Sequence, residues 1–104
     1  MSVPVAVDEI PERLADFDRG YLLTTRDGLV KAVSVRAVAE DGGLLVRTPG
    51  GGSLRNIGAN PSVTLLFPPL DVVGMSLLVD GSAAVEGDDV RITPASAVLH
   101  QPVA

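Results

Sequence analysis

Closely spaced turn signals constrain the fold of this chain more than any other sequence feature. Asp27-Gly28 and Asp41-Gly42 each lie between two apolar runs, and Gly87-Asp88 marks a third turn. Asp-Gly pairs favour tight hairpin turns, because both central residues of such a turn need positive φ. The pattern therefore predicts short antiparallel strands rather than strand–helix–strand units.

Six segments have the composition of β-strands. The clearest is residues 76–86, where Leu77, Val79 and Ala83 alternate with polar residues as in a half-buried strand. Gly81 in its middle predicts a bulge or a sharp bend. The other predicted strands are residues 21–25, 29–39, 44–48, 63–67 and 90–93. Six strands joined by short turns predict an all-β fold, either a barrel or a sandwich.

Only small helices are predicted between the strands. A helix N-cap needs a short polar side chain, and a residue before proline avoids the helical region. Residues 49–52 (Pro-Gly-Gly-Gly) and the tail from His100 are expected to be irregular. The expected helices are residues 8–17 with Asp8 as N-cap, about two turns from the N-cap Ser53 to Asn60, and a turn over residues 95–99 after Pro94.

Size and composition predict one domain with a partner surface. The chain has 104 residues, of which 46% are hydrophobic and 3% aromatic. We read residues 1–104 as a single domain, near the lower limit for a comfortable independent core. So much apolar surface on a small chain favours self-association, and we expect a homodimer. A valine-rich monomer core is the alternative.

Several classes of function are excluded or disfavoured. The chain has no cysteine and one histidine, His100, so thiolate and multi-histidine metal sites are excluded within one chain. Its net charge of −5 disfavours nucleic-acid binding. The start MSVPVAVDEIPERL lacks the pattern of a signal peptide, and no apolar run is long enough for a membrane helix. We therefore expect a cytoplasmic protein that contacts no membrane.

The segment from Thr48 to Asn56 has the parts of an anion site. It contains three glycines, a hydroxyl at a helix start and a cation one turn later. Free amides at a helix N-terminus bind anions, and an arginine fork grips phosphate oxygens. Thr48, Ser53 and Arg55 are the candidate ligands. An ordinary capped helix after a mobile loop, with Arg55 solvated, is the alternative.

Catalytic residues cannot be assigned from the sequence. Lys31 and Arg36, on the predicted strand 29–39, are interpreted as solvated charges. His100 could act as a general acid or shape a pocket, but a lone histidine in a proline-flanked tail is more often neither. No Ser-His-Asp triad can be assembled.

The order of these segments resembles the pyridoxamine 5′-phosphate oxidase-like, FMN-binding split-barrel superfamily. The matching stretches are YLLTTRDGLVKAVSV (residues 21–35), LLVRTPGGGSLRNIGANPSVTLLF (residues 44–67) and SLLVDGSAAVEGDDVRITP (residues 76–94). The middle stretch is the most specific, with a strand ending in Thr, a Ser-x-Arg-Asn helix start and then Asn-Pro. The resemblance covers most of the chain.

The resemblance implies a six-stranded antiparallel Greek-key split barrel that is dimeric, with cofactor sites across the dimer interface. FMN is the cofactor it implies first, and F420 or haem serve in some relatives. The phosphate end would match Thr48, Ser53 and Arg55, supported by Asn56. The isoalloxazine ring would lie along the second strand, near Val33, Ser34 and Val35.

Three functions follow from the resemblance. The first is a flavin- or deazaflavin-dependent oxidoreductase of a small molecule. The second is a cofactor-binding module without turnover, and the third is a degenerate structural dimer that binds nothing. Oxidation of pyridoxamine phosphate itself is not expected, because the further basic residues and the extended C-terminal segment of the true oxidases are not found in this sequence.

Overall fold

A computed structural model describes residues 1–101 and shows an eight-stranded antiparallel sheet with small helices. The strand order is β3-β2-β6-β7-β8-β5-β4, and β1 pairs with β8 beside this path. The elements are β1 (Ser2–Val5), the 3-10 turn η1 (Val7–Glu9), α1 (Ile10–Leu14), β2 (Gly20–Arg26), β3 (Leu29–Val35), β4 (Ala37–Glu40), β5 (Gly43–Val46), α2 (Gly51–Ala59), β6 (Ser62–Phe67), β7 (Ser76–Glu86) and β8 (Asp89–His100).

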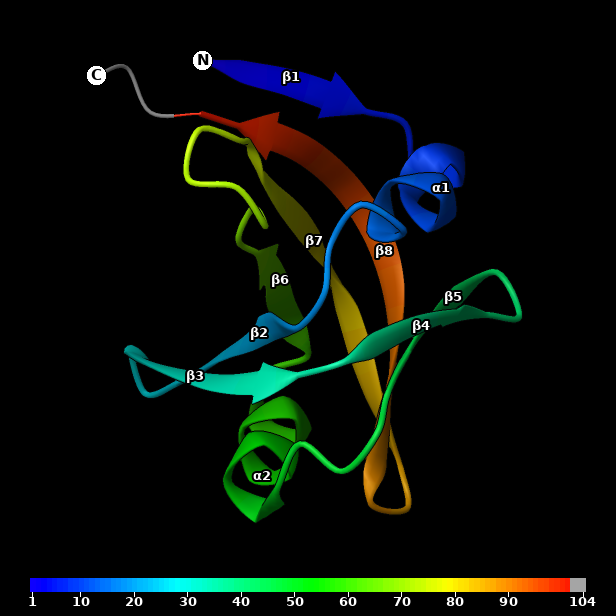
Figure 1. Cartoon of the computed structure of the whole chain (residues 1–104). Helices are drawn as coiled ribbons and strands as arrows, with labels where there is room; N and C mark the ends of the chain where they lie inside the picture. Colours follow the sequence, from blue (N-terminus) through cyan, green and yellow to red (C-terminus); the bar gives the residue numbers. More distant parts are fainter. Residues whose placement is uncertain (102–104) are drawn as a thin grey trace.

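The sheet curls into a barrel that stays open at one seam. Its two end strands, β3 and β4, are consecutive in the chain and are separated only by Arg36. Figure 1 shows them as one ribbon that crosses the front of the molecule. No ladder joins β3 to β4 among the described residues, so the barrel is split. Strands β5 to β8, in the spatial order β6-β7-β8-β5, form a Greek key.

Both Asp-Gly turns form as predicted. Asp27 and Gly28 have φ values of 53° and 78°, and Asp41 and Gly42 have 52° and 79°. Positive φ at both central residues is the geometry whose twist matches a hairpin. The first turn pairs β2 with β3 and thereby sets the register of Thr24 against Lys31.

The predicted bulge at Gly81 is confirmed. The β7–β8 register shifts between Asp80 and Gly81, and a β-carbon built on Gly81 would lie 2.5 Å from the Thr93 carbonyl oxygen. The helical turn predicted over residues 95–99 is wrong, because β8 continues through Pro94. Pro94 is paired with Gly81 beside the register shift, where the ladder is already irregular and the missing N–H costs least.

Other boundaries also differ from the prediction. Eight strands replace the expected six, because β1 was not predicted and the expected strand 29–39 divides at Arg36. The first helix is shorter than residues 8–17, and Asp8 lies in η1 without capping α1. Its buried Ile10 packs into the core.

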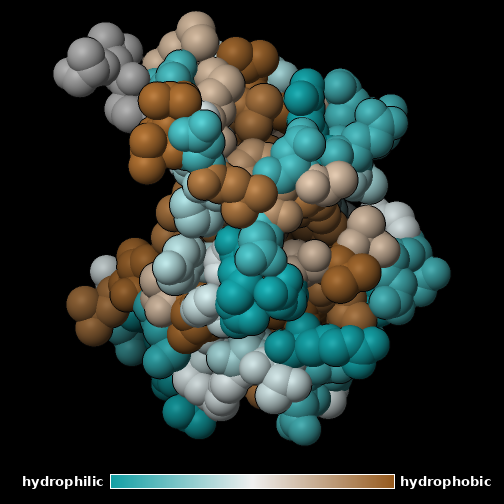
Figure 2. All heavy atoms as spheres, in the orientation of Figure 1, coloured by the Kyte–Doolittle hydropathy of each residue, from teal (hydrophilic) through white to brown (hydrophobic). Residues whose placement is uncertain are grey.

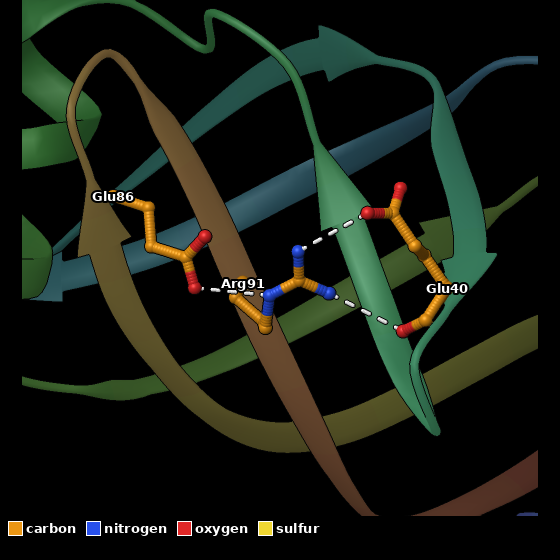
Figure 3. A network of polar contacts seen from close by, with 3 residues as sticks. All are labelled: Glu40, Glu86 and Arg91. Atoms are coloured by element: carbon orange, nitrogen blue, oxygen red, sulfur yellow. Dashed lines mark hydrogen bonds and ion pairs between the residues drawn. The ribbon is translucent and has the colours of Figure 1, made fainter.

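The core lies inside the curled sheet. The largest fully buried side chains include Phe67, Leu22, Leu65 and Ile92, and α2 adds Ile57 from one end of the barrel. Arg91 of β8 links the β4 edge to the β7–β8 hairpin (Figure 3), because its guanidinium donates to the Glu86 carboxylate at 2.9 Å and to the Glu40 carbonyl at 3.2 Å. Within residues 1–101, no helix has the length and apolar character needed to span a membrane.

Candidate functional site

Helix α2 begins three residues earlier than the sequence predicted. Its N-cap is Gly50, with φ 104°, and Gly51 and Gly52 are helical. The amide of Leu54 makes the first helical bond, to the Gly50 carbonyl at 3.1 Å. The amides of Gly51, Gly52 and Ser53 therefore have no partner within the helix, and those of Gly51 and Gly52 lie on residues that solvent reaches. Ser53 is not the N-cap, and the glycine segment 49–52 is only partly irregular.

Two cations lie over these glycines. A β-carbon built on Gly52 would lie 2.9 Å from Lys31 Cε and 3.0 Å from Nζ, and one on Gly51 would lie 3.1 Å from Arg55 Nη1. Lys31 reaches α2 because it pairs with Thr24, whose buried side chain faces the same helix. The sequence analysis interpreted Lys31 as solvated, since the register that places it becomes visible only in the folded hairpin.

The electrostatics of this arrangement favour an anion. A helix N-terminus is itself positive, so a lysine and an arginine placed there repel it. Within residues 1–101, neither Lys31 nor Arg55 forms an ion pair with a carboxylate. The free amides and the two cations are the donor set that a phosphate group prefers. We call Gly51, Gly52, Lys31 and Arg55 the glycine cradle.

The Ser53 side chain does not face the cradle's solvent side. It is fully buried, and its hydroxyl is the one buried side-chain polar atom without a hydrogen-bond partner in the described part of the chain. In this conformation neither its hydroxyl nor its backbone reaches the surface.

Asn56 anchors the helix of the cradle, and Thr48 precedes it in the chain. The Asn56 side-chain amide donates to the Thr24 hydroxyl at 3.0 Å, which fastens α2 to β2. Thr48 has the left-handed φ of 47°, rare for a non-glycine residue, and its amide donates to an Asp89 carboxylate oxygen at 3.0 Å. The amide is therefore occupied, whereas the exposed Thr48 side chain remains free to bind.

The predicted ring-binding residues lie on an edge strand. β3 pairs with β2 alone, so its other edge presents unpaired amides and carbonyls. Val33 and Val35 face the core, and Ser34 faces outward. Ser34 lies about 10 Å along the strand from Lys31, since a strand rises about 3.3 Å per residue.

One cavity joins Ser34, Val35 and Thr48 to residues that were not predicted. It has a volume of about 340 Å³, and its remaining lining residues are Arg19, Arg36, Val38 and Arg47. The sequence analysis did not consider Arg19 or Arg47, and interpreted Arg36 as solvated. Their position in the sequence could have identified these arginines, because each stands immediately next to a strand terminus.

Two larger cavities contain none of the predicted site residues. One, of about 710 Å³, lies between α1 and the β4–β5 turn and is bordered by Asp8, Glu40 and Asp41. Figure 2 shows hydrophobic surface in the hollow between these elements. Its carboxylates would repel a phosphate. The other, of about 700 Å³, covers the outer face of β2, β6 and β7.

His100 does not join the cradle. It is the last residue of β8, at the end of the molecule opposite α2 (Figure 1), and its Nδ1 lies 3.0 Å from the Ser2 hydroxyl. The structure thus brings Arg55 together with Lys31 at the start of α2. Asn56 faces Thr24 instead, and Thr48 lines the cavity beside Ser34 and Val35.

Comparisons with known proteins agree with this fold. No protein-family model matches the chain. Uncharacterised proteins of Mycobacterium bovis (Mb0449c) and Mycobacterium tuberculosis (MT0457) are each 32% identical in an alignment of 121 positions that covers 96% of this chain and 82% of each relative.

Solved structures resemble it at low identity. A candidate pyridoxamine 5′-phosphate oxidase of Listeria innocua superimposes with a TM-score of 0.75 at 15% identity, over 89% of this chain and 96% of that chain. A FAD-binding protein of Mesorhizobium loti gives 0.74 at 17% identity, over 97% and 99%. The FAD-binding protein of Mycobacterium smegmatis gives 0.67 at 20% identity, over 97% and 100%. The chain belongs to one family with the mycobacterial proteins Mb0449c and MT0457, and its split-barrel fold is that of the solved structures described as a candidate pyridoxamine 5′-phosphate oxidase and as FAD-binding proteins.

Proposed function

We propose that this chain binds FMN through the glycine cradle and acts, as a homodimer, as a flavin-dependent oxidoreductase of a small molecule. The observation that supports this most strongly is the placement of Lys31 and Arg55 over the first turn of α2, without carboxylate partners among the described residues. A bound phosphate relieves the repulsion between these cations and the positive helix end.

Different residues would hold the phosphate and the ring of the cofactor. The amides of Gly51 and Gly52, with Lys31 and Arg55, hold the phosphate, and the exposed Thr48 hydroxyl is a further donor on the side of the ring. Asn56 keeps α2 in place through Thr24. The edge of β3 that pairs with no strand would face the polar rim of the ring near Val33, Ser34 and Val35, where the Ser34 carbonyl already accepts from Arg19. The flavin supplies the electron transfer, and the protein orients it and controls its surroundings.

The structural neighbours support a flavin in general terms. Two of them are described as FAD-binding. FMN, FAD and F420 all present phosphate oxygens to a protein, so the cradle suits any of them. We propose FMN, with F420 as the alternative.

An apolar row on the outer sheet face supports the homodimer. Tyr21, Leu66, Leu78 and Val98 lie side by side across β2, β6, β7 and β8, because each pairs with the next in register. Tyr21 is 42% exposed. A partly exposed apolar strip of this kind suits a two-fold interface, and an isologous contact would cover it on both copies at once.

A binding function without turnover is the second candidate. The described lining of the cavity beside Ser34 consists of three arginines, two valines, a serine and a threonine. None of these side chains exchanges a proton near neutral pH, so the cavity supplies no general acid or base. A cofactor carrier or sensor would need neither.

One titration tests both candidates. The purified protein is mixed with FMN, F420 or haem, and binding is followed by flavin fluorescence and visible absorbance. Saturable binding of FMN, followed by its reduction with NADPH and reoxidation in air, would support the oxidoreductase. Binding without reduction would favour the carrier. No saturable binding of any of the three would overturn the proposal and leave a structural dimer.

A further inference from the structure

We infer that the cavity between the β3–β4 crossing and the end of β5 is a binding site for a small carboxylate. We call its three basic residues, Arg19, Arg36 and Arg47, the arginine triad. Three of the seven lining residues are arginines, in a chain whose net charge is −5. If the proposed function holds, this carboxylate is the class of substrate.

The triad is part of an uneven distribution of charge over the molecule. The chain has 8 basic residues. Five of them belong to the triad and the glycine cradle, namely Arg19, Arg36, Arg47, Lys31 and Arg55. Figure 2 shows a strongly hydrophilic patch at the centre of the molecule, where Figure 1 draws the crossing from β3 to β4. An acidic protein thus concentrates its cations along one seam, which favours anions there over the rest of the surface.

Two arginines of the triad are held in place by the fold. Arg19 donates from Nε to the Ser34 hydroxyl at 2.9 Å and from Nη2 to the Ser34 carbonyl at 3.3 Å. Arg36 donates from Nη1 to Asp18 at 2.6 Å. A guanidinium has five N–H donors, so three remain on Arg19 and four on Arg36. Because both side chains are already ordered, a ligand would lose less affinity to their immobilisation.

Arg47 is the member without a partner. Within residues 1–101 its guanidinium makes no hydrogen bond and no ion pair. Two carboxylates lie near the triad. Asp18 pairs with Arg36, and Asp89 accepts the Thr48 amide. Three positive charges against two negative ones leave one uncompensated, and neither aspartate lines the cavity. A planar carboxylate accepting two parallel N–H bonds from Arg47 would complete the set.

The remaining lining residues indicate the rest of the ligand. Val38, which is 54% exposed, supplies most of the apolar surface, since Val35 is only 3% exposed, and Ser34 and Thr48 border it with hydroxyls. A volume of about 340 Å³ is at the lower end of the range for ligand pockets. The site therefore suits a compact acid with an apolar body, such as an aromatic or short aliphatic carboxylate. It adjoins the proposed FMN site, because Ser34, Val35 and Thr48 belong to both, and the arginine triad lies beside the place proposed for the ring.

Binding of benzoate to the cofactor-free protein tests this inference separately from the proposed function. Chemical shifts of backbone amides are followed by NMR during titration with benzoate, with neutral benzamide and with inorganic phosphate. We expect saturable shifts at Ser34, Val38 and Thr48 with benzoate and none with benzamide. Arg47→Gln should weaken benzoate binding about tenfold or more, since it removes a charge-assisted contact. Arg26→Gln, which removes an equal charge at the β2–β3 turn, should leave it unchanged.

Three results would overturn the inference. If benzoate caused no chemical-shift changes, or if Arg47→Gln and Arg36→Gln left these changes as they are, the triad would not be the carboxylate site. Equal binding of benzamide would show that charge is not recognised. Saturation at these residues by phosphate but not benzoate would assign the cavity to a tetrahedral anion. A failure of FMN to bind would overturn the proposed function and leave the benzoate result standing.

Discussion

The ammonium group of Lys31 covers Gly52 so closely that a β-carbon on this glycine would lie 3.0 Å from Nζ. Lys31 stands on β3 and Gly52 in the first turn of α2, so the contact links the edge strand to the helix start. Only a residue without a side chain leaves the first-turn amides open beneath the lysine. This pair connects the fold to the proposed phosphate site.

Replacing Gly52 by alanine should separate folding from cofactor binding. The new β-carbon would meet only the flexible end of Lys31, which can swing away. Alanine in a helix is about 0.5–1 kcal/mol more favourable than glycine, so thermal unfolding should shift upward. FMN affinity, measured by fluorescence quenching, should fall about tenfold or more, because the displaced lysine no longer reaches the phosphate.

The control is Gly58→Ala in the same helix. A β-carbon there would meet nothing within 4 Å. This variant should gain similar stability and keep full FMN affinity. Unchanged FMN affinity in Gly52→Ala would mean that the phosphate is not held at the first turn of α2.

Removing either cation of the cradle should weaken the cofactor complex. Arg55→Ala and Lys31→Gln each delete one charge-assisted phosphate contact, worth on the order of 1.5–3 kcal/mol. Isothermal titration of FMN should show this loss in both variants, with a weaker dependence on salt. The benzoate affinity of the arginine triad should not change. If Arg55→Ala binds FMN as tightly as the unmodified protein, the phosphate has been placed wrongly.

Turns and bulges that carry a local signal can be predicted from the sequence. Contacts between strands that are far apart in the chain are predicted less well. Both Asp-Gly turns and the bulge at Gly81 were predictable, because positive φ and a missing side chain leave local signatures. The passage of β8 through Pro94 was not, since pairing with β7 overrides the usual stop signal. The helical state of Gly51 and Gly52 likewise contradicts helix propensity, and the anchoring of α2 by Asn56 on Thr24 outweighs it.

The candidate site shows the same division. Arg55 could be proposed from the glycine segment, since both lie within a few residues of each other. Lys31 could not, because only the β2–β3 register places it on the core-facing side next to Thr24. Arg19, Arg36 and Arg47 are far apart in sequence and meet only where the ends of three strands converge.

Breaking the contact between Asn56 and Thr24 should loosen α2. Asn56→Ala leaves the buried Thr24 hydroxyl without its 3.0 Å partner, a loss of about 1–3 kcal/mol in the free energy of unfolding. Urea denaturation would measure it. Adding Thr24→Val, which removes the orphaned hydroxyl, should recover part of the loss. If the effects of the two substitutions on the free energy of unfolding simply added, the hydrogen bond would contribute nothing to stability.

Ser53→Ala should stabilise the protein or leave it unchanged. The serine hydroxyl is buried without a partner, and such a group costs about 1–3 kcal/mol of desolvation. Differential scanning calorimetry should therefore show an unfolding temperature equal to or above that of the unmodified chain. FMN affinity should stay within about twofold, because the buried hydroxyl does not reach the cradle. A tenfold loss would show instead that the hydroxyl turns toward the phosphate on binding.

Placing a charge in the apolar row should dissociate the proposed homodimer. Leu66 lies between Tyr21 and Leu78 on the outer sheet face, outside the core. Leu66→Glu would set two added carboxylates near the two-fold axis of a dimer whose copies each already carry a net charge of −5. The unmodified chain should sediment at twice its 10.7 kDa mass at micromolar concentration, and this variant at the single mass.

Leu70→Glu makes the same exchange in the exposed β6–β7 loop and should stay dimeric. A 10.7 kDa species for the unmodified chain would leave the apolar row unexplained and contradict the dimer. Dissociation by Leu70→Glu instead would move the interface to that loop.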